Sequence, residues 1–134
     1  MEFDKNGNLW FTDQVNDAIW RYFVNERKFE MYRVPITGSY PPGLSIEDKG
    51  MVWFSEIFGK RIGVLDPRKV IDNTTSGITE FPFKDIEYET LRPGLISKSY
   101  NNTIWFTAVT YPEGGNIVSF DFISKNFTVY PRRY

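Results

Sequence analysis

A short aromatic cluster occurs three times along the chain and limits the folds that the chain can adopt. Its three copies are residues 8–13 (NLWFTD), 51–56 (MVWFSE) and 103–108 (TIWFTA). The tryptophans of the copies, Trp10, Trp53 and Trp105, lie 43 and 52 positions apart. An internal repeat of this length predicts several similar units that stack beside one another.

Turn-forming residues precede each copy of the cluster. These segments are residues 4–7 (DKNG), 47–50 (EDKG) and 99–102 (SYNN). Residues of this kind supply a positive φ between two hairpin strands, so each cluster is predicted to be the second strand of a hairpin. The matching first strands are residues 42–46 (PGLSI) and 93–97 (PGLIS), and only residues 1–3 precede the first turn.

Each repeat continues into two further predicted strands. Third strands are expected at 18–23, 61–66 and 116–121, and fourth strands at 29–35, 78–82 and 127–131. Each of the three predicted fourth strands contains a proline. Proline suits an outermost strand, because its missing N–H costs no hydrogen bond to a neighbouring strand there. Four antiparallel strands in roughly 40–50 residues is the pattern of a β-propeller blade.

We therefore predict an all-β chain of about three four-stranded antiparallel blades. The blades are expected at about residues 1–35, 42–83 and 93–131, in a single propeller-type domain or fragment of 134 residues. The aromatic content of 18% favours strands as well.

The repeated Trp-Phe pair is interpreted as core that packs between blades. Adjacent residues on a strand point to opposite faces, and an inner strand of a propeller is covered on both faces by neighbouring blades. Glycines at the first strands, Gly43 and Gly94, are expected where backbones approach closely. The predicted core residues are Trp10, Phe11, Trp53, Phe54, Trp105 and Phe106.

Three blades are too few for a closed ring, because propellers close with roughly four to eight. Uncovered Trp-Phe faces at both ends would form large apolar patches of the kind that associate. The chain is therefore expected to be an incomplete propeller or half of a dimeric six-bladed one. The predicted partner is a second copy (a homodimer) or the remaining blades of a parent protein.

Composition excludes several functional classes. Lysine and arginine total 16 against 17 acidic residues, which argues against a nucleic-acid partner. No stretch is apolar for the 18 or so residues that a membrane span needs, and residues 1–4 lack the features of a signal peptide. Neither cysteine nor histidine is present, so disulfides, thiolate catalysis and the usual general base are excluded.

Three sequons, at residues 73–75, 101–103 and 126–128, leave an extracellular or a cytoplasmic location open.

The middle repeat resembles a known propeller family. Its segments are residues 42–44 (PGL), 52–56 (VWFSE), 61–67 (RIGVLDP) and 78–82 (ITEFP). They are similar to the repeat of the seven-bladed propellers that include streptogramin B lyase (virginiamycin B lyase). The resemblance implies an enzyme that opens a cyclic depsipeptide by elimination, with magnesium and a histidine base on the face where the second strands end.

The positions that match this rim are Asp13, Glu56 and Ala108, next to residues 40–43 and 91–94. Asp13 and Glu56 are a candidate pair of oxygen ligands for magnesium, although polar residues also end strands at any solvated rim. Carboxylates at an open rim are expected to stay ionised and weakly basic. Recognition of a carboxylate or a sugar by charge and stacking is predicted for Tyr40, Arg92 and Tyr111.

Two functions follow as predictions. The first is a non-catalytic binding or scaffold propeller whose rim takes a small molecule, a peptide or a glycan. The alternative is a fragment of a magnesium-dependent, streptogramin B lyase-like enzyme whose missing blades carry the catalytic base.

Overall fold

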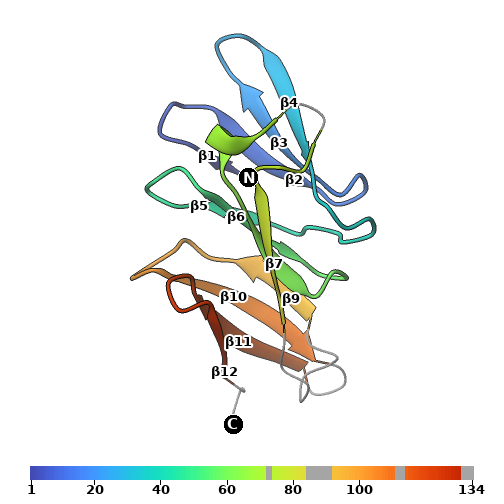
Figure 1. Cartoon of the computed structure of the whole chain (residues 1–134), viewed down its shortest axis with the longest axis vertical. Helices are drawn as coiled ribbons and strands as arrows, with labels where there is room; N and C mark the ends of the chain where they lie inside the picture. Colours follow the sequence, from blue (N-terminus) through green and yellow to red (C-terminus); the bar gives the residue numbers. More distant parts are fainter. Residues whose placement is uncertain (72–73, 84–91, 111–113, 131–134) are drawn as a thin grey trace.

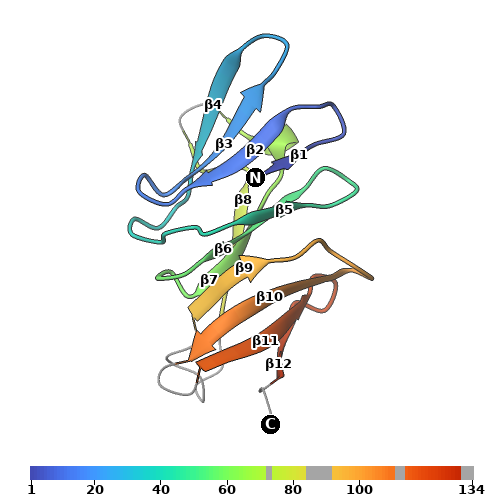
Figure 2. The same ribbon diagram turned by 180° about the vertical axis from the view of Figure 1, so that it is seen from behind.

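A computed structural model describes residues 1–71, 74–83, 92–110 and 114–130 of the chain. Its described part is all-β and contains three four-stranded antiparallel sheets, as the repeat predicted. The sheets stack in chain order along the long axis of the molecule (Figure 1), and the view from behind shows the same order (Figure 2). We call them blades 1, 2 and 3.

The strands within each blade follow one another in sequence. Blade 1 contains β1 (Glu2–Phe3), β2 (Leu9–Asp13), β3 (Ala18–Phe23) and β4 (Lys28–Arg33). Blade 2 contains β5 (Leu44–Ile46), β6 (Val52–Glu56), β7 (Arg61–Leu65) and β8 (Ile78–Pro82), with a short 3-10 helix η1 (Pro67–Lys69) before β8. Blade 3 contains β9 (Arg92–Ile96), β10 (Thr103–Thr110), β11 (Gly114–Asp121) and β12 (Asn126–Tyr130).

The predicted turns have the backbone conformation that their residues favour. Gly7 and Gly50 have φ values of 78° and 86° before the second strands of blades 1 and 2. Asn101 and Asn102, with φ values of 49° and 56°, occupy the corresponding turn of blade 3. These turns close the hairpins at the same point of each repeat.

Two hydrophobic cores join the blades, and the Trp-Phe pairs alternate between them. The first core lies between blades 1 and 2 and contains Trp10 and Phe54. The second lies between blades 2 and 3 and contains Trp53 and Phe106. Phe11 and Trp105 point away from these cores and are only half-buried, because no described blade covers the outer faces of blades 1 and 3.

A close approach of ring and backbone makes one glycine necessary. Gly63 of β7 lies opposite Phe54 of β6, and a Cβ at residue 63 would lie 2.4 Å from Phe54 Cζ. The predicted crowding also holds at Gly94, where a Cβ would lie 2.8 Å from Thr107 Oγ1. At Gly43 a Cβ would make only an ordinary contact, 3.5 Å from Leu95 Cδ2.

Candidate functional site

The turns that follow β2 and β6 lie on one side of the stack, together with the start of β9 (right in Figure 1). The connection between blades 1 and 2, residues 34–43, lies on the same side. This side is the rim at which the sequence places the candidate binding residues.

Two of those residues meet around an aromatic ring that the sequence analysis did not select. The rings of Tyr40 and Phe58 make an edge contact with centroids 5.5 Å apart. The Arg92 guanidinium lies over the Phe58 ring, 5.1 Å from its centroid. All three side chains are exposed. We refer to Tyr40, Phe58 and Arg92 as the rim cluster.

Blade 1 holds the first member of the rim cluster in place. The Asp17 carboxylate accepts hydrogen bonds from Gly38 N at 2.7 Å and Tyr40 N at 2.9 Å. Tyr40 has a positive φ of 57°, an uncommon conformation for a non-glycine residue. Asp17 thus fixes the direction in which the Tyr40 ring leaves the connection.

The other two members are positioned by blade contacts. Phe58 N donates a hydrogen bond of 3.1 Å to Ser39 O, so the β6–β7 turn is tied to the connection. Ser55 Oγ donates to Gly94 O, which holds the start of β9 against β6 two residues from Arg92. Three separate segments are therefore brought together at the rim.

Glu56 does not lie at the open surface, which corrects the prediction of an exposed rim carboxylate. Its side chain is 0% exposed, on the same strand face as Phe54, which packs on blade 1. Ser39, also fully buried, and the β6–β7 turn cover it; a Cβ at residue 59 would lie 3.3 Å from Glu56 Oε1. Neither of its carboxylate oxygens has a well-formed hydrogen bond within the described residues.

The burial of Glu56 changes its titration. The pKa of Glu56 is raised to about 8, mainly by burial and also by the neighbouring Glu80 carboxyl group, while the Ser39 hydroxyl and Arg61 act in the opposite direction. Arg61 pairs with Glu80, with 3.8 Å between Nη1 and Oε1. The sequence led us to expect an ionised, weakly basic carboxylate here. That expectation is wrong, because Ser39 and the β6–β7 turn enclose the end of β6.

Asp13 has a different environment. Its carboxylate accepts hydrogen bonds from Asn16 Nδ2 at 2.8 Å, Asn16 N at 3.1 Å and Trp20 Nε1 at 3.2 Å. The hydrogen bonds from Asn16 lower the pKa of Asp13. These contacts come from the β2–β3 turn and from β3, and they identify Asp13 as the residue that closes the β2–β3 hairpin.

The predicted magnesium pair does not come together as a ready-made site. Among the residues that the structure describes, Asp13 and Glu56 share no hydrogen-bonding or charged partner. Across the described ranges, no group of three or more acidic, histidine or cysteine side chains is arranged to hold a metal ion. Magnesium therefore stays a prediction from the resemblance.

Of the two remaining predicted rim positions, the structure describes one. Ala108 is fully buried in the core between blades 2 and 3 and contributes no surface. Tyr111 lies outside the described residues.

Of the sequon asparagines, Asn101 and Asn126 are exposed, and Asn73 lies outside the described residues. No helix in the part that the structure covers is long and apolar enough to cross a membrane.

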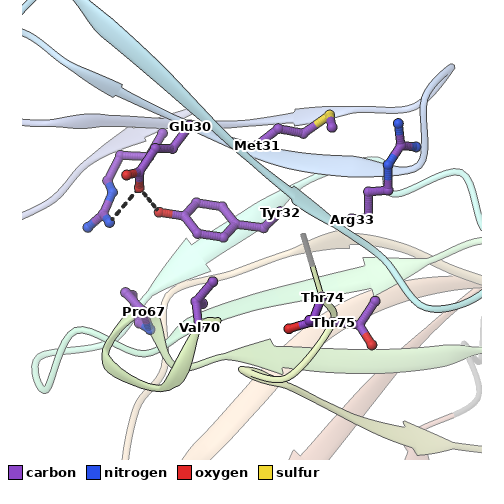
Figure 3. Close-up of a pocket in the computed structure, with 9 residues that line it drawn as sticks. Glu30, Met31, Tyr32, Arg33, Pro67, Val70, Thr74 and Thr75 are labelled. Carbon is purple, nitrogen blue, oxygen red and sulfur yellow. Dashed lines mark hydrogen bonds and ion pairs between the residues drawn. The ribbon is translucent and has the colours of Figure 1, made fainter. Parts of the chain in front are cut away.

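A cavity of about 540 Å³ lies between β4 of blade 1 and the β7–β8 segment of blade 2 (Figure 3). The Glu30 carboxylate accepts hydrogen bonds from Arg21 Nη2 at 3.1 Å and from Tyr32 Oη at 2.6 Å. Arg21 also lies over the Trp10 ring, 4.7 Å from its centroid. Arg21 and Glu30, which both line this cavity, are thus paired with each other, and we assign no ligand to the cavity.

Comparisons with known proteins identify solved structures that have a similar architecture. No protein-family model matches the chain, and a search of curated proteins found no relative. A streptogramin B lyase structure matches 96% of this chain with a TM-score of 0.73 and 27% identity. A catalytically inactive His-to-Ala variant of virginiamycin B lyase from Staphylococcus aureus, with quinupristin, matches 95% with a TM-score of 0.71 and 26% identity.

The chain spans only 38% of the length of each of these two lyases. A luciferin-regenerating enzyme also matches 96% of this chain, with a TM-score of 0.66 and 13% identity, over 43% of its own length. At that identity the likeness concerns the fold alone. The three blades thus have a streptogramin B lyase-like β-propeller fold, as the repeat suggested.

Proposed function

We propose that the chain is a non-catalytic β-propeller module that binds a small ligand at the rim cluster. The observation that carries this proposal is the exposed Tyr40–Phe58–Arg92 arrangement, in which three segments from different parts of the sequence present two rings and one cation. Exposed large aromatic rings next to an arginine are typical of recognition surfaces.

The chemistry of the cluster defines the ligand class. Arginine presents a planar set of donors that suits a carboxylate, and the two rings offer faces and edges for an apolar ring. A ligand that carries a carboxylate next to an aromatic group, such as the end of a peptide, matches both features. A glycan or another small molecule would use the rings alone.

Titration with N-acetyl-L-phenylalanine, followed by NMR chemical shifts, tests this proposal. A dissociation constant of about millimolar is expected for a ligand of this size. Arg92→Ala should weaken binding by about tenfold to a hundredfold, since a charge-assisted hydrogen bond contributes about 1.5–3 kcal/mol. Lys98→Ala, which removes an exposed cation from the β9–β10 turn, is the matched control and should bind as the wild type does.

N-acetyl-L-phenylalaninamide, which lacks the carboxylate, is the control on the ligand side. It should bind the wild type and Arg92→Ala equally weakly. Equal affinity of the wild type for the acid and the amide would contradict the role of Arg92.

A second candidate function is supported by the raised pKa of Glu56. A carboxylate that titrates near neutral pH can take a proton from a carbon next to a carbonyl group. Loss of that proton, with cleavage of the neighbouring ester C–O bond, would open a cyclic depsipeptide by elimination, as the resemblance to streptogramin B lyase implies. Glu56 is fully buried, so a substrate would reach it only if Ser39 or the β6–β7 turn moved aside.

Incubation with quinupristin at pH 8 to 9, with and without magnesium, tests the second candidate. Elimination leaves the mass of the substrate unchanged, so ring opening is followed by chromatography. Turnover that Glu56→Gln abolishes and Arg92→Ala retains would favour the lyase-like function. Intact quinupristin in all samples is the expected result of the first proposal.

A further inference from the structure

The two inner junctions of the stack are built in the same way. In each, the tryptophan of the second strand stacks on an aromatic residue of the fourth strand: Trp10 on Tyr32, with centroids 5.4 Å apart, and Trp53 on Phe81, with centroids 6.0 Å apart. The face that carries this stack packs against the phenylalanine of the next blade, Phe54 or Phe106. Each junction thus joins a tryptophan face to a phenylalanine face.

The outer face of blade 3 repeats the tryptophan half of such a junction. Trp105 stacks on Tyr130 with centroids 5.4 Å apart and an angle of 27° between the planes, close to the 25° of Trp53 and Phe81. Trp10 and Trp53 are 1% and 4% exposed, but Tyr130 is 46% exposed and Trp105 is only half-buried. This stack has the geometry of the inner junctions without their cover.

The outer face of blade 1 supplies the other half. Phe11 lies on it, and its ring neighbours are Trp20, at 6.3 Å, and Phe29, at 6.4 Å between centroids. Phe29 also contacts Tyr22, at 4.6 Å, and is 58% exposed. Four aromatic side chains on one sheet face make an apolar patch of the kind that marks an interaction surface.

The two open faces are therefore one tryptophan face and one phenylalanine face. Contact between the tryptophan face and the phenylalanine face would repeat the arrangement of both inner junctions. A contact between two like faces is found nowhere in the described part of the chain. Joining unlike faces is a head-to-tail contact, and two copies that make it twice form a closed ring. Such a ring has six blades, within the range of four to eight known for closed propellers.

We propose that a second copy of this chain covers these faces, with the Trp105–Tyr130 face of one copy on the Phe11–Phe29 face of the other. Burying the half-exposed rings removes apolar surface from water at both junctions, which stabilises the pair. The surface is distinct from the rim cluster, so the pairing does not depend on the proposed ligand-binding function.

Mixing two single variants tests the head-to-tail arrangement. Phe29→Glu blocks the phenylalanine face and Tyr130→Glu blocks the tryptophan face; both residues are exposed, so the blades should still fold. By light scattering at 1 to 100 µM, the wild type is expected at about twice 15.8 kDa and each variant alone at 15.8 kDa. An equimolar mixture of the two variants keeps one intact face of each kind and should regain an open dimer.

The control is Ile123→Glu, which places the same charge at a 70% exposed position in the β11–β12 turn and should dimerise as the wild type does. Circular dichroism of every variant checks that the strands are retained. A wild type that is monomeric throughout this range would overturn the proposal and leave the faces to blades from another polypeptide segment. Dimers of Tyr130→Glu alone, with no gain on mixing, would overturn it in favour of a contact between like faces.

Discussion

The ring of Phe54 lies directly above Gly63 on the neighbouring strand, so that a Cβ at residue 63 would lie 2.4 Å from Phe54 Cζ. The two residues are cross-strand partners in β6 and β7, and both are buried. Gly63 therefore makes room for a phenylalanine that packs on blade 1.

Gly63→Ala is expected to destabilise the protein by about 1–3 kcal/mol, the usual range for overpacking a filled core. Urea unfolding followed by tryptophan fluorescence measures the change. Gly115→Ala is the matched control, because no atom of the described residues, its two chain neighbours aside, lies within 4 Å of the Cβ position there. Equal stabilities of the two variants would show that the Phe54 ring can move aside without loss.

The two tryptophans on either side of blade 3 should differ in their contribution to stability. Trp53 is 4% exposed and contacts the rings of Phe120 and Phe122 at 5.9 and 5.3 Å, so Trp53→Ala should cost about 3–5 kcal/mol. Trp105→Ala should cost clearly less, since Trp105 is half-buried on an outer face. Unfolding should be measured at nanomolar protein concentration to disfavour association. The reverse order of the two losses would contradict the stacking of the blades.

Stability should fall as the pH rises through the range in which Glu56 titrates. The pKa of Glu56 in the folded protein is raised from 4.5 to about 8, so the folded state keeps a proton that the unfolded chain releases. The stabilising contribution of the protonated group is complete below about pH 4.5 and is lost progressively toward pH 8. Glu56→Gln, which cannot ionise, should lack this loss and become more stable than the wild type at pH 8 to 9.

Urea unfolding at pH 5, 6.5, 8 and 9 measures this dependence. Glu26→Gln, a substitution at an exposed position in the β3–β4 turn, is the control and should follow the wild type. Parallel pH profiles for the wild type and Glu56→Gln would mean that Glu56 is not protonated inside the folded protein.

Asp17 should act on ligand binding through Tyr40. Asp17→Ala removes the acceptor for Gly38 N and Tyr40 N and releases the connection that presents the Tyr40 ring. We expect the affinity for N-acetyl-L-phenylalanine to fall several-fold, with a loss of stability of about 0.5–1.5 kcal/mol per hydrogen bond. Asp48→Ala, at an exposed position in the β5–β6 turn, should leave the affinity unchanged.

Much of the fold follows from the sequence because its signals are local. The repeated apolar cluster at residues 51–56 and 103–108, with turn residues before each copy, is enough to place the hairpins. The repeat itself predicts that Trp10 and Trp53 lie between blades, since every copy must bury the same faces. The same reasoning explains why Phe11 and Trp105 stay half-buried, because they have the pattern of core residues without a blade to cover them.

The candidate site depended on tertiary structure. Asp13 and Glu56 hold the same position in their repeats and were indistinguishable in the sequence, yet one closes an open turn while the other is enclosed by Ser39 and the β6–β7 turn. Phe58 became part of the site only because Tyr40 and Arg92 fold onto it from the preceding connection and the following blade. Sequence periodicity therefore determined which face of a strand each side chain occupies. The packing of one blade on the next decided which of these side chains are exposed, charged and near one another, because burial and proximity depend on segments that are far apart along the chain.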